Sequence, residues 1–199
     1  LKADFQKENF KRVTYSFSNY VAIDQPDKFR DRLYKLCSKN NVLGRIYIAN
    51  EGINAQLSIP ESNWTIFKNS LSRFKNLKKL QFKKAIEDGN SFLKLIVKVK
   101  KEIVAYNVDD NDVDMEFVGK HLSPQDFNEK IDQHNAVVVD MRNYYESEVG
   151  RFESAITPNV ATSRELLPEV KDLIKSHKKD PVLLYCTGGI RCEKASSFL

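Results

Sequence analysis

The two halves of this 199-residue chain show different hydrophobic patterns in their predicted strands. In the first half, apolar and polar residues alternate along 13–18, 53–59 and 93–100, which is typical of strands with one buried face. In the second half, the strand candidates are continuous apolar runs at 136–140 and 181–185, which are typical of parallel strands buried on both faces. The difference predicts two domains, and a chain of this length accommodates two of about 100 residues each.

The first half predicts an α+β ferredoxin-like domain over residues 1–104. Pro26 fits the first turn of a helix, and apolar residues recur at helical spacing after it. A further short strand is expected within 80–86. The order β-α-β-β-α-β is that of the ferredoxin-like fold. The expected elements are a strand at 13–18, a helix at 26–37, a hairpin at 44–59, a helix at 64–74 and a strand at 93–99.

The second half predicts an α/β domain with a parallel sheet over residues 121–199. The two apolar strands alternate with helices that are expected to begin at Ser123 and Thr162. In such sheets the functional site lies at the carboxyl ends of the strands. The residues that follow 136–140 and 181–185 are therefore the candidate site residues.

The charge changes sign between the halves. Residues 68–101 contain eleven Lys or Arg against two acids, whereas residues 102–129 contain eight acids against one Lys. We interpret 105–120 as an acidic linker between the two domains. Its run of Asp is not a calcium loop, because Met115 and His121 stand where an EF-hand needs Gly and Glu. No metal site is predicted.

Composition excludes several classes of protein. With 41% apolar residues the chain can form ordinary cores, and no run approaches the roughly 20 apolar residues of a membrane helix. The first ten residues lack the apolar stretch of a signal peptide, and three cysteines are too few for a disulfide scaffold. These features predict a cytoplasmic protein with no membrane partner, and they carry no signal for an oligomeric state.

The most specific chemical motif follows the last apolar strand. Cys186 comes directly after this strand and precedes a Gly pair and a helix start. Loop amides and a helix N-terminus direct positive potential at the sulfur, which lowers the thiol pKa and makes the thiolate a nucleophile. The alternative, an inert thiol beside a tight turn, does not explain the Gly pair or the Arg. The predicted active-site loop is Cys186, Thr187, Gly188, Gly189, Ile190 and Arg191, with Arg191 expected to close the ring and hold an anion.

The other thiols and the histidines have weaker patterns. Cys192, six residues after Cys186, is a candidate resolving thiol for a persulfide or disulfide, or alternatively a small residue packed at the helix start. Cys37 lies on the apolar face of the first predicted helix and is expected in the core. The three histidines are scattered without metal-ligand spacing.

Residues 121–199 resemble the rhodanese family. Asp140, Arg142, Glu146 and Gly150 match its motif D-x-R, three residues, E, three residues, G, although Arg151 stands where a His usually follows. The resemblance implies that Cys186 bears the reactive or persulfide sulfur and that Asp140, Arg142 and Glu146 support its loop. Phosphatase relatives on this fold have five residues between Cys and Arg, and this chain has four, so sulfur chemistry is favoured over phosphate chemistry.

Three segments together resemble the bacterial oxygen-dependent tRNA uridine hydroxylase family: GRIYIANEGINAQLSIP, VVVDMRNYYESEVGRFESA and YCTGGIRCEKAS. This resemblance implies a ferredoxin-like domain joined to a rhodanese domain, tRNA as partner, and 5-hydroxylation of the wobble uridine. It also implies molecular oxygen as co-substrate and Cys186 as the essential residue, with no other cofactor evident. Asn50 stands where the family often has His. Family members extend further, so we expect the rhodanese-like domain to be truncated at Leu199.

Two alternatives stay open from the sequence: a rhodanese-type sulfurtransferase with a persulfide on Cys186, and a non-enzymatic sulfur-carrier or RNA-binding module. The basic first half favours an RNA partner, because Lys side chains bind phosphates without reading sequence. An ordinary solvated sheet face is the other interpretation of this block. The candidate RNA-binding residues are Lys78, Lys79, Lys83, Lys84, Lys94, Lys98 and Lys100.

Overall fold

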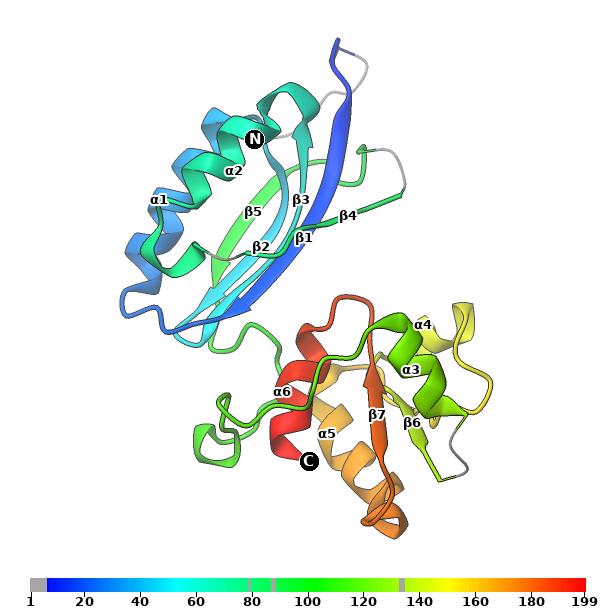
Figure 1. Ribbon diagram of the computed structural model, residues 1–199. Coiled ribbons are helices and arrows are strands. Elements are labelled where there is room, and N and C mark those ends of the chain that lie inside the picture. Colours follow the sequence, from blue (N-terminus) through cyan, green and yellow to red (C-terminus); the bar gives the residue numbers. More distant parts are fainter. Residues whose placement is uncertain (1–6, 79, 87–88, 133–134) are drawn as a thin grey trace. The chain divides into compact units, whose positions relative to one another are not determined.

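The computed structural model describes residues 7–78, 80–86, 89–132 and 135–199 (Figure 1). These residues fold as two compact units that divide between Ile103 and Val104. Within the described ranges, no helix has the length and apolar character that a membrane-spanning segment requires.

The N-terminal unit is built on a five-stranded sheet with the order β4-β1-β3-β2-β5. The first four of these form the ferredoxin-like arrangement, and β5 is added beside β2, to which it runs parallel. The other pairs are antiparallel. The predicted ferredoxin-like fold is therefore confirmed, but its last strand is the short β4 within 80–86, and the strand predicted to close the fold at 93–99 is the added β5. The strands are β1 (Arg12–Tyr20), β2 (Leu43–Ala49), β3 (Gly52–Pro60), β4 (Lys83–Lys84) and β5 (Leu95–Val99).

A tight hairpin joins β2 to β3 and requires glycine at one position. Gly52 has φ of +151°, and a side chain there would collide with the backbone carbonyl of Asn19 in β1. Only Gly permits both this backbone conformation and this close approach. The turn at Asn50, Glu51 and Gly52 sets the register of β2 against β3, in which Ala49 pairs with Gly52 and Leu43 with Ser58.

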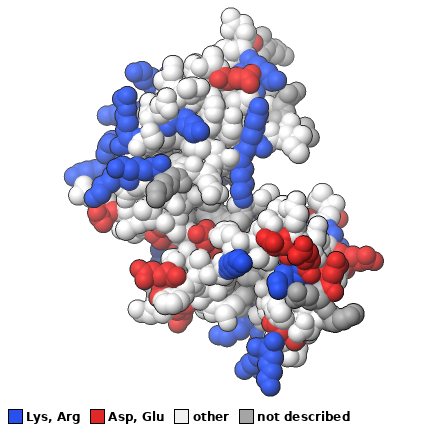
Figure 2. Space-filling view, in the orientation of Figure 1, with Lys and Arg blue, Asp and Glu red and all other residues white. Residues whose placement is uncertain are grey.

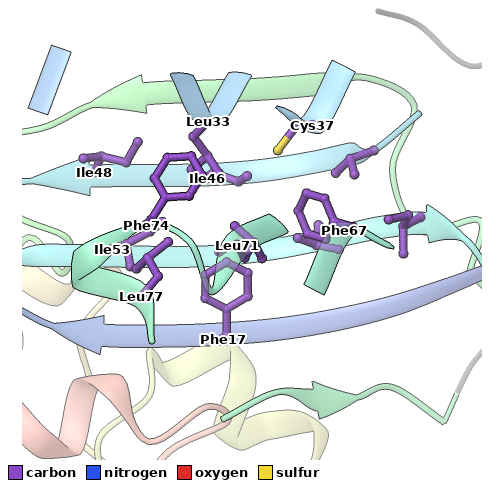
Figure 3. Packing of buried hydrophobic residues seen from close by; sticks show 14 of the residues in the cluster. Phe17, Leu33, Cys37, Ile46, Ile48, Ile53, Phe67, Leu71, Phe74 and Leu77 are labelled. Carbon is purple, nitrogen blue, oxygen red and sulfur yellow. The ribbon is translucent and has the colours of Figure 1, made fainter. Parts of the chain in front are cut away.

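Two helices cover one face of this sheet, α1 (Pro26–Lys39) and α2 (Trp64–Leu71) (Figure 1). Short 3-10 turns flank α2, η1 (Glu61–Asn63) before it and η2 (Lys75–Leu77) after it. Figure 3 shows the apolar side chains of both helices packed on those of the central strands. The core contains Leu33 and Cys37 from α1, Phe67 and Leu71 from α2, and Ile46, Ile48 and Ile53 from the strands.

The opposite face of the sheet carries several polar side chains, together with apolar ones such as Leu43. Residues that pair across strands point to the same side of a sheet. The register therefore places Ser16 of β1, Gln56 of β3 and Arg45 of β2 in one row across this face. The alternation in the sequence separated these residues correctly from the apolar set, because its period of two matches the pleat.

The C-terminal unit has two parallel strands, with a bridge from Ile156 to Val139 of β6. All four residues of β6 are buried, as the continuous apolar run predicted. Helices lie around this strand pair (Figure 1). The elements are η3 (Asp110–Asp112), α3 (Pro124–Ile131), β6 (Val137–Asp140), α4 (Tyr144–Val149), α5 (Ser163–Leu173), η4 (Lys175–His177), β7 (Val182–Tyr185) and α6 (Ile190–Phe198).

The acidic segment 105–120 lies along α6. Tyr106 is 1% exposed, and its hydroxyl donates to the backbone carbonyl of Arg191 at 2.8 Å. Further along, the Asp114 N–H donates to the hydroxyl of Ser197 at 2.8 Å. Asp109, Asp112, Asp114 and Glu116 are exposed, while the backbone of the segment is attached to the helix, so the segment is part of the C-terminal unit.

We predict that Phe67→Ala costs the N-terminal unit about 3–5 kcal/mol of unfolding free energy, because Phe67 is fully buried. Its neighbour Ile66 is 63% exposed, so Ile66→Ala should change stability by less than about 0.5 kcal/mol. Trp64 is the single Trp of the chain, and its fluorescence during urea unfolding reports on this unit. Equal shifts for the two variants would contradict the packing described.

Candidate active site

Cys186 lies where the two parallel strands end. β7 stops at Tyr185 and α6 begins at Ile190, so the loop 186–189 spans the gap between strand and helix. The carboxyl ends of β6 and β7 lie side by side, because the Met141 N–H donates to the carbonyl of Tyr185 at 2.9 Å. The residues that follow both strands therefore meet in one place.

The sulfur of Cys186 is surrounded by hydrogen-bond donors. The Gly189 N–H donates to it at 3.0 Å, and Gly189 has φ of +87°, a left-handed conformation that favours glycine. The side chain and backbone N–H of Cys192 also act on the pKa of this sulfur. The loop therefore curls so that donors converge on one atom.

These contacts stabilise the thiolate of Cys186. The hydrogen bond from the Cys192 thiol has the largest effect, and together with the other donors it lowers the pKa of Cys186 to about 5 against the opposing effect of burial. The Arg191 charge and the Gly189 N–H act in the same direction. At neutral pH Cys186 is thus ionised and nucleophilic.

Cys192 behaves in the opposite way. Its hydrogen bond to Cys186, together with burial, raises the pKa of the Cys192 thiol above its usual range. Both cysteines are free and only partly buried. The pair therefore holds one thiolate and one thiol at neutral pH. Cys37 is fully buried in the other unit, where burial raises its thiol pKa.

Arg191 is held by a carboxylate of the protein. Its two terminal nitrogens donate to Glu146 at 2.6 and 2.9 Å, and Nη2 also reaches the Thr187 hydroxyl at 3.3 Å. The hydrogen bonds from Arg191 lower the pKa of Glu146 to about 2. Arg191, predicted from the sequence to hold an anion, thus has a charge partner within the fold, and the pair ties α4 to the loop.

Asp140 and Arg142 brace the strand ends without contacting Cys186. Asp140 is fully buried, and Arg142 donates to both of its oxygens, at 2.8 and 2.6 Å. The Tyr185 hydroxyl donates to the same carboxylate at 2.7 Å. Arg142 also donates to the carbonyl of Gly150 at 2.6 Å. The Arg of the D-x-R motif therefore links the end of β6 to the residue that follows α4.

Sequence reasoning did not single out Tyr185 or Tyr106. Tyr185 had a usable signal, because an aromatic residue ends the strand directly before the reactive Cys. Tyr106 had none, since its contact with the Arg191 backbone joins residues that are 85 positions apart. Among the described residues, no group of three or more His, Cys, Asp or Glu side chains is placed to hold a metal ion.

The predicted RNA-binding lysines occupy different sides of the N-terminal unit. Lys83 pairs with Ser16 and Lys98 with Tyr47, which places both on the polar sheet face. Lys100 lies over the Tyr47 ring at 5.4 Å, on the same side. Lys84 pairs with Tyr15 and faces the opposite way.

Lys78 follows η2, Lys94 directly precedes β5, and Lys79 lies outside the described residues. The six described lysines are exposed. In the view of Figure 2, Lys and Arg predominate on the surface of the N-terminal unit.

Comparison with known families divides the chain at the same place as the fold. Residues 12–103 match the UPF0176 acylphosphatase-like domain, and residues 123–199 match the rhodanese-like domain. The chain thus contains an acylphosphatase-like unit and a rhodanese-like unit, and the Cys186 loop lies in the second of these.

Curated relatives match the whole chain. A tRNA uridine(34) hydroxylase of Leptospira interrogans is 49% identical over 100% of this chain and 54% of its own length. Proteins of the same name from Escherichia fergusonii and Buchnera aphidicola are 45% and 44% identical, over 100% and 96% of this chain and 57% and 62% of their own lengths. The resemblance to the tRNA uridine hydroxylase family is therefore confirmed. The chain spans little more than half the length of these relatives.

We predict that alkylation of Cys186 by iodoacetamide follows a thiolate titration with a midpoint near pH 5. Cys37 should stay unmodified in the native protein because it is fully buried. Cys192→Ala should move the midpoint upward, toward that of an ordinary thiol, since the main donor is lost. Cys192→Ser retains a hydroxyl donor and should stay closer to wild type. An unchanged midpoint in Cys192→Ala would contradict the assigned hydrogen bond.

Proposed function

We propose that this protein hydroxylates the wobble uridine of tRNA at C5, with molecular oxygen as co-substrate and Cys186 as the essential residue. The observation that carries the proposal is the match of the whole chain, at 43–49% identity, to proteins named tRNA uridine(34) hydroxylase. The proposed substrate also places the enzyme in the cytoplasm.

The ionised sulfur of Cys186 suits this substrate. C6 of uracil is the electrophilic end of a double bond conjugated with a carbonyl group. A thiolate that adds to C6 moves the electron pair of that double bond to C5, which takes one atom of O2. The second oxygen atom leaves as water, with two electrons and two protons from an external reductant. Departure of the thiolate after loss of the C5 proton restores the ring. The low pKa of Cys186 supplies the nucleophile for this addition, and it also makes the sulfur a good leaving group.

The other site residues hold this sulfur in place in the proposed mechanism. Gly189 donates to it, and Gly188 leaves open space beside the loop, since a Cβ there would meet no atom within 4 Å. Glu146 fixes Arg191, while Asp140 and its partners keep the strand ends rigid. We assign Glu146 and Asp140 positioning roles, because each carboxylate is paired with an Arg of the same unit.

We propose that the polar face of the N-terminal sheet binds the RNA backbone. Arg45 is exposed on this face, in the row that includes Ser16 and Gln56, and Lys83, Lys98 and Lys100 lie on the same side. The partly exposed ring of Tyr47 offers a surface for base stacking. We further propose that the two domains comprise 1–104 and 121–199, with 105–120 as the connection that packs on α6.

A persulfide-carrying sulfurtransferase is the second candidate, favoured by the rhodanese-like match and by the same thiolate. The ion pair of Arg191 with Glu146 counts against an anionic sulfur donor, because the positive charge is already balanced. Thiosulfate cyanide transfer and tRNA hydroxylation, measured on the same preparation, separate the two functions.

We predict that Cys186→Ser lowers hydroxylation of tRNA by more than about 100-fold, because a Ser hydroxyl is not ionised at neutral pH. The measurement is mass spectrometry of nucleosides from tRNA incubated with the enzyme in air, with 5-hydroxyuridine as the product. Cys37→Ala is the matched control and should retain activity, since Cys37 is a core residue of the other unit. Full activity in Cys186→Ser would remove this residue from the mechanism.

We predict that Lys83→Ala and Lys98→Ala each weaken binding of an anticodon stem-loop and lower the slope of log Kd against log salt by about one. Lys35→Ala, an exposed change on α1 at the other face of the sheet, should leave both quantities unchanged. Fluorescence anisotropy at several salt concentrations measures them. Equal effects of all three variants would indicate unspecific attraction to a basic protein.

A further inference from the structure

The C-terminal unit has a hollow that the mechanism proposed above does not use. Its volume is about 710 Å³, and pockets that take small molecules measure about 300–1,000 Å³. The first turn of α4, the segment 159–161 and one side of α5 form its walls. The polar and aromatic residues that line it are Tyr144, Asn159, Arg164, Glu165, Glu169 and Asp172.

The walls of this hollow belong to the packed fold. The Tyr144 N–H donates to the carbonyl of Val160 at 3.0 Å, which fastens α4 to the segment 159–161. On one side of α5, Leu166 and Val170 are buried. The other side of this helix carries three carboxylates at helical spacing, those of Glu165, Glu169 and Asp172.

The charged groups of the hollow are free to meet a ligand. Among the residues that the structure describes, Arg164, Glu169 and Asp172 take part in no ion pair. Glu165 accepts a hydrogen bond from the Thr162 hydroxyl at 3.0 Å. Within the described ranges, no three such carboxylates are placed to hold a metal ion, so the hollow is not arranged as a metal site.

Tyr144 adds an aromatic surface. Its ring is 40% exposed where it lines the hollow, and the ring of Tyr145 packs against it edge-on at 5.7 Å. An exposed aromatic ring offers a stacking surface to a planar ligand such as a nucleobase. The ligand that fits is therefore planar, with hydrogen-bond donors for a carboxylate and acceptors for an Arg.

Guanine is the nucleobase that meets these demands. One of its edges has two adjacent donors, N1–H and the N2 amino group, which match the two oxygens of a carboxylate. Another edge has two acceptors, O6 and N7, which match a guanidinium group. Adenine, cytosine and uracil lack two adjacent groups that both donate.

We propose that this hollow binds a guanine base, stacked on Tyr144, with N1–H and N2–H donating to Glu169 and with Arg164 donating to O6 and N7. Glu169 is the carboxylate assigned, because it is half-buried in the middle of the row and has no printed ion-pair partner. This inference does not rest on the hydroxylation proposed above. A guanine of an RNA strand and that of a free nucleotide share this chemistry.

Calorimetric titration of the whole chain with nucleosides tests the assigned edges. Guanosine should bind, and inosine, which lacks the N2 amino group, should bind at least about tenfold more weakly. 7-Deazaguanosine, which lacks the N7 acceptor, should also bind more weakly. Equal binding of guanosine and inosine overturns the proposal, as does a lack of guanosine binding at millimolar concentration.

Variants test the assigned residues. Tyr144→Ala and Glu169→Gln should each weaken guanosine binding by at least about tenfold, whereas Tyr144→Phe retains the ring and should bind as wild type does. Glu148→Gln is the matched control, because Glu148 is an exposed carboxylate of α4 outside the lining. Alkylation of Cys186 checks that each variant is folded. Unchanged guanosine binding in Tyr144→Ala or in Glu169→Gln overturns the proposal.

Competition separates the two sources of guanine. Three carboxylates outnumber the single Arg in the hollow, so phosphate groups have to stay outside it, and GTP should bind more weakly than GMP. A short oligouridine with one central guanine should lose affinity in Tyr144→Ala, while the same strand with adenine should not. This loss, with weaker binding of GMP, supports an RNA strand as the source. GMP that binds as tightly as the strand supports a free nucleotide, and GTP as the tightest ligand overturns the proposal.

Discussion

In the C-terminal unit the site depends on one negative charge, the thiolate of Cys186, held in a partly buried loop. A charge removed from water is stable only where hydrogen bonds and opposite charge replace the solvent. Here the replacement comes from the Cys192 thiol, the Gly189 N–H and the charge of Arg191, and the net effect is a pKa near 5. Each donor is placed by the turn from β7 into α6, so the chemistry of the site depends directly on the geometry of this one connection.

A second layer of interactions keeps that connection rigid. Arg191 would be a mobile cation beside the sulfur without Glu146, which fixes its guanidinium in a two-pronged ion pair. The buried carboxylate of Asp140 does the same for Arg142 and fastens the strand ends. Tyr106 adds a contact to the backbone of α6 from the acidic segment. These residues explain why the loop can hold its donors in place although it contains two glycines.

The N-terminal unit contributes a different physical property. Its helices bury one face of the sheet, and the other face is left polar, with positive charge at Arg45, Lys83 and Lys98. Such a surface suits contact with a phosphate backbone, which needs charge more than shape. The proposed function assigns RNA binding to this unit and the nucleophile to the other. The match of the whole chain to tRNA uridine(34) hydroxylases supports this proposal.

Much of this organisation could be predicted from local sequence. Strand alternation, helical spacing and the Gly at position 52 specify the order of elements in the N-terminal domain, because these signals act within a few residues. The order of strand, Cys186, Gly pair and helix likewise marks the nucleophile. The partners of the charged residues could not be obtained in this way. Only the tertiary structure brings Glu146 to Arg191, pairs Lys83 with Ser16 of β1, and attaches the segment 105–120 to α6. These contacts join residues far apart in the chain, and they exist only after the strands have paired.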